Sequence, residues 1–97
     1  MSDISFKKGN DNYWMASSVR VIGNGKYPHL PVPSVSLSDS EKILAYMNFL
    51  FGGEFEYFCR DAENNEYFGN RMVMGIKFLN PADEAHFIMV VSDGLKI

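Results

Sequence analysis

The chain has one cysteine, Cys59, and no long uncharged apolar run. A single cysteine excludes an intrachain disulfide and is typical of proteins that fold in a reducing compartment. No stretch approaches the roughly 18 apolar residues that a membrane-spanning helix needs, and the N-terminus lacks the apolar core of a signal peptide. We therefore expect a soluble protein of the cytoplasm.

Motifs for catalysis and metal binding are also missing. The sequence has two histidines, His29 and His86, and neither stands at the short spacing from Cys59 that marks a structural zinc site. A thiol nucleophile needs a base within hydrogen-bond reach. Cys59 instead alternates with Phe55 and Tyr57, which predicts a small core residue that is inert because it is buried. We predict no catalytic residue and no metal.

A nucleotide site is not indicated either. The segment Gly23-Asn24-Gly25-Lys26 lacks the glycine, lysine and hydroxyl spacing of a phosphate loop, and prolines follow it instead of a helix. We interpret it as a turn. The sequence therefore predicts no cofactor, and we do not expect an enzyme.

The composition predicts one domain over residues 1–97. The chain is 46% apolar and 14% aromatic, which is enough for a single core and argues against disorder. Periodicity and turn signals predict, in order, a strand at 12–22, a proline-rich surface loop at 26–36, a helix beginning at 38, a strand at 54–60, a hairpin turn at 61–65, a strand at 66–79, a helix at about 81–92 and a short strand at 95–97. This order predicts an α+β fold, the ferredoxin-like βαββα(β) plan with an antiparallel sheet and two helices on one face.

Local signals support both helices. Ser38 and Glu41 have the spacing of a capping box, and Gly52-Gly53 predicts the end of the first helix. Asn80-Pro81 is a cap followed by proline at the first helical position. The residues at 86–91 are β-branched enough that a buried strand is an alternative for the second helix.

The strand at 66–79 has a clear two-residue period. Its alternate positions predict an inward row, and Gly69 and Gly75 indicate a bend or bulge. The inward row consists of Met72, Met74, Ile76 and Phe78.

Negative charge is concentrated between Ser38 and Glu66. This segment has seven carboxylates and only two cationic side chains, so its formal charge is −5. An acidic folded surface favours a basic partner. The candidate partner-binding residues are Glu54, Glu56, Asp61, Glu63 and Glu66, with Asp39 and Glu41 as outer contributors. The alternative is a solvated strand face on which Glu54 and Glu56 are laddered with Arg60, Arg71 and Lys77.

Direct binding of nucleic acid is a further alternative, because a ferredoxin-like sheet with exposed aromatic residues is a plan for RNA recognition. Tyr57, Tyr67 and Phe68 are present, but the basic residues that such a surface needs are missing. Glu54, Glu56 and Glu63 would repel phosphate. We therefore expect neither nucleic acid nor membrane as a direct partner.

In size, acidic balance and lack of a catalytic motif the chain resembles small phage-encoded inhibitor proteins. Its segment 78–87, FLNPADEAHF, is similar to a strand-to-helix junction that recurs in uncharacterised small phage proteins. Length and charge are most similar to anti-CRISPR proteins that act on type I-F surveillance complexes, some of which imitate DNA. The resemblance implies a phage inhibitor in the host cytoplasm that occupies a basic, nucleic-acid-binding surface of a CRISPR effector. The alternative is a small assembly protein that self-associates through a hydrophobic surface such as the loop at 28–33 with Tyr27 and Leu30.

Overall fold

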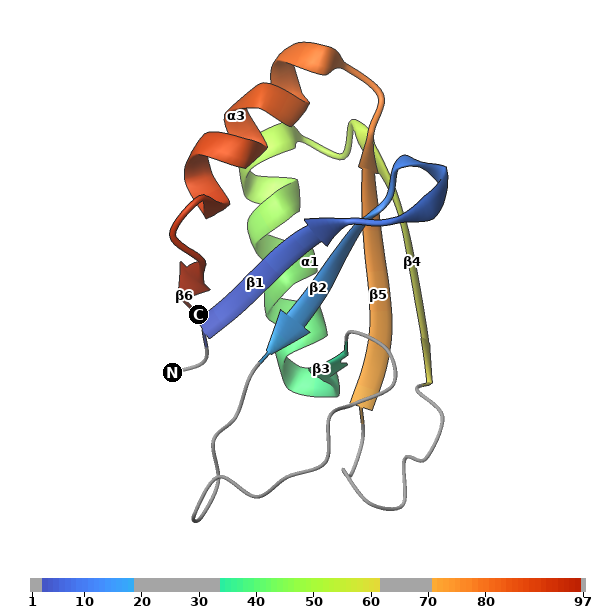
Figure 1. The fold of residues 1–97 in the computed structure, drawn as a ribbon. Coiled ribbons are helices and arrows are strands. Elements are labelled where there is room, and N and C mark those ends of the chain that lie inside the picture. The colour runs from blue at the N-terminus through green and yellow to red at the C-terminus, as the bar shows by residue number, and fades with distance from the viewer. Residues whose placement is uncertain (1–2, 19–33, 62–70, 97) are drawn as a thin grey trace.

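The computed structural model describes residues 3–18, 34–61 and 71–96 (Figure 1). The elements are β1 (Asp3–Lys8), the 3₁₀ turn η1 (Asn10–Asn12), β2 (Trp14–Ser18), β3 (Val35–Ser36), α1 (Leu37–Phe51), β4 (Phe55–Asp61), β5 (Arg71–Phe78), α3 (Pro81–Val91) and β6 (Leu95–Lys96). Within these described residues, an antiparallel sheet and two helices confirm the predicted α+β class.

The strand order differs from the predicted plan. The sheet runs β3-β5-β2-β1-β6, and β4 pairs with β5. Residues 71–72 of β5 pair with β3, residues 75–76 pair with β2, and the full-length partner of β5 is β4. The ferredoxin-like order is not confirmed, because β1 lies between β2 and β6 and the prediction had no strand there.

The N-terminal hairpin replaces the predicted strand at 12–22. Within that range the structure has β2 at Trp14–Ser18, and residues 19–22 lie outside the described part. The turn between β1 and β2 holds Asp11 and Asn12 at φ of 61° and 65°. Asp and Asn tolerate this left-handed conformation because their short side chains bond locally. The turn lets Lys8 pair with Trp14 directly.

One face of the sheet carries the core. Ile4, Ala16, Met74 and Ile76 are fully buried there, as are Ile43 and Met47 of α1 and Phe87 of α3. Both helices belong to this single cluster and therefore cover the same face. The Phe87 ring lies 5.0 Å from Phe6 and 4.8 Å from Phe78. The predicted inward row of β5 is confirmed.

The start of α1 lies earlier than predicted. Its N-cap is Ser36, whose hydroxyl accepts from the Asp39 backbone N–H at 3.0 Å, so the predicted cap at Ser38 is wrong. Ser36 and Ser38 each stand three residues before a carboxylate, so the sequence does not show which of them caps the helix. Ile43 and Met47 of the helix are fully buried. Gly52 ends the helix at φ of 63°, as predicted.

Residues 81–91, for which the sequence left a buried strand as the alternative, form the helix α3. Asn80 caps α3 by accepting from the Ala82 N–H at 2.8 Å, and Pro81 opens the first turn. Glu84, in that turn, accepts from the Trp14 indole N–H at 2.9 Å and from Lys8 Nζ at 3.1 Å. These bonds hold α3 against the β1–β2 hairpin.

Arg71, at the start of β5, forms hydrogen bonds to the end of β2 and to the residue before β3. Its Nη2 donates to the Ser34 carbonyl at 2.7 Å and to the Ser18 hydroxyl and carbonyl at 3.0 and 3.3 Å. Its Nε donates to the Ser34 hydroxyl at 3.2 Å. Arg71 is only 8% exposed, so its expected place in a surface charge ladder with Glu54 and Glu56 is wrong.

Candidate functional site

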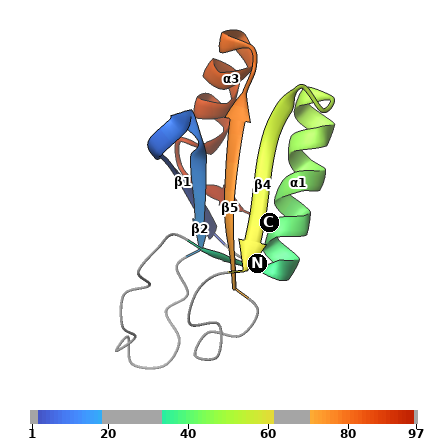
Figure 2. The ribbon, with the colours of Figure 1, turned by 90° about the vertical axis from the view of Figure 1, so that its right-hand side faces the viewer.

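Strand β4 is an edge of the sheet. Among the described strands it pairs with β5 alone. Figure 2, which looks onto this side of the molecule, shows β4 in the foreground with α1 beside it. Four of its seven residues are exposed, and these are Glu56, Tyr57, Arg60 and Asp61. A free edge and an exposed row of charges together make β4 the described strand best placed for contact with another molecule.

The predicted partner-binding residues differ in their exposure to solvent, and two of them lie outside the described residues. Glu54, Glu56 and Asp61 are exposed on or beside β4, and Glu41 is exposed on α1. Glu63 and Glu66 lie outside the described residues, as do Tyr67, Phe68 and the loop at 28–33.

Asp39 is not a surface contact. It is 3% exposed, and its Oδ2 has no hydrogen-bond partner in the part of the chain that the structure describes. Asp39 lies in the first turn of α1, four residues before the fully buried Ile43, and therefore on the side of the helix that faces the core. The expectation that Asp39 contributes to the outer part of the site is therefore wrong.

The exposed carboxylates of β4 form a line and not a cluster. Glu54 and Asp61 are separated by roughly 24 Å at the usual rise of a strand. Glu56 lies opposite Lys77 in register, and the Lys77 ammonium lies 5.8 Å from the centre of the Tyr13 ring. The remaining carboxylates of the line lie at its two ends.

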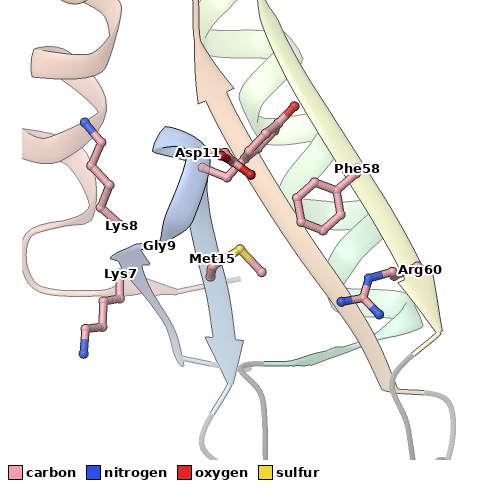
Figure 3. A pocket seen from close by; sticks show the side chains of 8 residues that line it. Lys7, Lys8, Gly9, Asp11, Met15, Phe58 and Arg60 are labelled. Atoms are coloured by element: carbon pink, nitrogen blue, oxygen red, sulfur yellow. The ribbon is translucent and has the colours of Figure 1, made fainter.

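The face of the sheet away from the helices carries a shallow groove of about 490 Å³ (Figure 3). Its lining residues are Lys7, Lys8, Gly9, Asp11, Tyr13, Met15, Phe58 and Arg60. Phe58 and Arg60 reach across β5 toward Met15, whereas Lys7 points away from them. Lys8 is held by Glu84. The groove thus combines an apolar floor with charges of both signs.

Gly75 gives Phe58 its position in this groove. A Cβ at residue 75 would lie 2.5 Å from Phe58 Cε1 and 3.2 Å from Met15 Sδ. The residues of β4 and β5 pair one to one on both sides of Gly75, so the bulge predicted there is wrong. The glycine leaves room for the close approach of the Phe58 and Met15 side chains. Gly69, the other glycine of that prediction, lies outside the described residues. Phe58 stands two residues from Glu56 and Arg60, and this alternation was the available signal for its outward direction.

Chemically active groups are sparse in the described structure. No group of three or more His, Cys, Asp and Glu side chains in residues 3–18, 34–61 and 71–96 is arranged to hold a metal. Cys59 is half-buried and packs against the core, and His86 meets the Phe51 ring edge at 5.6 Å. The hydrogen bond from Trp14, with that from Lys8, lowers the pKa of Glu84 below its ordinary value of 4.5. This carboxylate is occupied in holding α3.

Two further observations bear on identity. Within the described residues, no helix has both the length and the apolar character needed to cross a membrane. Comparison with known proteins gave no match to a family model, to a curated protein or to a solved structure.

Proposed function

We propose that the protein is a non-enzymatic inhibitor that binds a basic, nucleic-acid-binding surface through the carboxylates of its β4 edge. The observation that supports this most is the exposure of Glu54, Glu56 and Asp61 along one edge strand. The resemblance to anti-CRISPR proteins leads us to propose a CRISPR surveillance complex of the host as the target, with DNA as the displaced ligand. Glu41 on α1 adds an outer contact.

The rigidity of β4 favours this role. Phe55 is 8% exposed and packs in the core, and its ring lies 6.4 Å from that of Phe78 on β5. The backbone that carries the carboxylates is therefore fixed before a partner arrives. A preorganised strand loses little entropy on binding.

Each contact is expected to be weak by itself. Exposed ion pairs contribute about 0–1 kcal/mol, so affinity requires several carboxylates that act together. Complementary charge chiefly raises the association rate and gives strong dependence on salt. Binding should therefore decline steeply as ionic strength rises.

A binding measurement with purified type I-F surveillance complex tests the proposal. The variant Asp61→Lys changes an exposed carboxylate of β4, and Asp93→Lys changes an exposed carboxylate after α3 by the same charge. We expect D61K to weaken binding several-fold at low salt and D93K to leave it near that of the unmodified chain. Thermal unfolding of both variants controls for folding.

Two results would contradict the proposal. One is the absence of binding by the unmodified chain at low salt. The other is equal loss in D61K and D93K, which would mean that overall charge matters and β4 does not. A companion measurement of target-DNA binding by the complex shows whether the bound protein displaces DNA, as the mimicry proposal requires.

A further inference from the structure

We propose that β4 also pairs with β4 of a second copy of the chain, antiparallel and symmetric about Phe58, so that one sheet continues through two molecules. The starting observation is the free edge of β4, whose backbone groups on that side have no partner strand among the described elements. Such an edge is a template for another strand. A two-fold arrangement uses the same surface on both copies.

The charges of β4 select this partner. In an antiparallel pair centred on Phe58, Glu56 of each copy lies opposite Arg60 of the other, and the ion pair occurs twice by symmetry. Opposite charges that face each other across antiparallel strands stabilise the pairing. Phe58 lies opposite itself on the same face, where it is half-buried in each single chain. The strand is thus complementary to itself in both charge and apolar character.

Neighbouring registers fit less well. Centring the pair on Tyr57 places Phe58 opposite Glu56, and centring it on Cys59 places Phe58 opposite Arg60. Either arrangement places a charge opposite Phe58, whereas the register about Phe58 places Asp61 opposite Phe55, which packs in the core of its own chain. Centring on Tyr57 also pairs Glu54 of each copy with Arg60 of the other. Of these three registers, however, the one about Phe58 is the one that pairs Glu56 with Arg60 and places no charge opposite Phe58, and register in a sheet is set by such matches.

The pairing has a consequence for the proposed function, and this step rests on that function. In the single chain Glu54 and Asp61 stand at opposite ends of β4. In the pair, Asp61 of one copy lies opposite Phe55 of the other and so stands one rung from Glu54, with the Glu54 and Asp61 side chains on opposite faces of the sheet. Self-pairing therefore places a carboxylate from each copy at both ends of the paired strands, one on each face of the sheet.

The experiment is sedimentation equilibrium of the purified chain over a wide concentration range, with three variants of β4. Glu56→Arg and Arg60→Glu each place like charges opposite one another twice, and the double variant restores opposite charges in reversed order. We expect the unmodified chain to dimerise, each single variant to raise the dissociation constant roughly tenfold or more, and the double variant to recover most of this loss.

Matched controls separate this effect from general charge and from folding. Glu41→Arg makes the same charge change as E56R on the exposed surface of α1 and should leave the dimer unchanged. Arg60→Glu is the cleaner single variant, because Arg60 lies opposite Val73 within the chain, whereas Glu56 lies opposite Lys77. Thermal unfolding of each variant shows that loss of the dimer is not loss of the fold.

The proposal is overturned if the unmodified chain stays monomeric at every concentration, if the double variant remains as weak as the singles, or if E41R disrupts as much as E56R. No binding partner enters this measurement, so its failure is independent of the proposed function. Conversely, D61K should still dimerise because Asp61 lies outside the Glu56–Arg60 pairs. If D61K still dimerises but no longer binds the partner, both proposals are supported: Glu56 and Arg60 serve dimerisation, and Asp61 serves partner binding.

Discussion

Strands β4 and β5 are neighbours in one sheet, yet they differ in almost every physical respect. Strand β5 has partners along both edges, and none of its eight residues is exposed. Strand β4 has one partner, and four of its seven residues are exposed. The difference shows that position in the sheet, more than composition, decides whether a strand serves the fold or is available for association.

Side chains at facing positions make the contrast concrete. Ile76 is fully buried, and its register partner Tyr57 is 54% exposed. Arg71 on β5 is buried and bonds to Ser18 and Ser34, whereas Arg60 on β4 is exposed. Each such pair offers a matched test of the distinction between a structural strand and an interaction strand.

The largest effect is expected for Ile76→Ala. Truncation of this buried side chain removes apolar contacts and leaves a cavity, which should lower the free energy of unfolding by about 2–5 kcal/mol. Tyr57→Ala at the facing position should cost about 1 kcal/mol or less, because an exposed side chain loses little on truncation. Chemical denaturation measures both. Equal losses would remove the contrast between the two strands.

Arg71→Met should have the next largest effect. It leaves the Ser34 carbonyl and the Ser18 and Ser34 hydroxyls without this donor in a buried site, at an expected cost of about 2–3 kcal/mol. The same substitution at Arg60 should change stability by about 0.5 kcal/mol or less. A neutral Arg71→Met would show that the arginine does not fasten β2, β3 and β5.

Gly75→Ala tests the close contact between the two strands. The new methyl must displace the Phe58 ring, which should destabilise the fold by about 1–2 kcal/mol. Adding Phe58→Ala removes the obstacle, so the double variant should lose less than the sum of the two single variants. Strictly additive losses in a double-mutant cycle would show that the two side chains do not compete for the same space.

The smallest effect concerns the pH dependence contributed by Glu84. Its pKa is lowered in the folded chain by Trp14 and Lys8, so its contribution to stability is complete well above pH 4.5 and is lost as pH falls through 4.5 and the lower folded pKa. The contribution should be under about 1 kcal/mol. Glu84→Gln should flatten this part of the stability profile. An unchanged acid slope would count against the assigned bonds.

Parts of the fold with local signals were predictable from the sequence. The two-residue period of 72–78 predicted the inward row, and Asn80-Pro81 predicted the start of α3. The start of α1 was wrong because Ser36 and Ser38 each stand three residues before a carboxylate, and the structure caps the helix at Ser36. Arg71 was misplaced because its partners, Ser18 and Ser34, are far away in sequence.

The candidate site was predictable only in part. Alternation in residues 54–60 correctly predicted the exposure of Glu54 and Glu56. That β4 is an edge follows from strand order, which depends on the unpredicted β1 and on pairing between distant segments. Asp39 carried the same charge as its neighbours in the sequence, and its burial follows from the register of α1.

Amide hydrogen exchange at low and high protein concentration tests most directly whether β4 is the association strand. In the dilute protein, the β5 amides should be protected throughout, and those β4 amides that face the free edge should exchange rapidly. At high concentration the edge-facing β4 amides should become protected while β5 stays unchanged. Protection of every β4 amide in the dilute protein, or no change in β4 with concentration, would contradict the account.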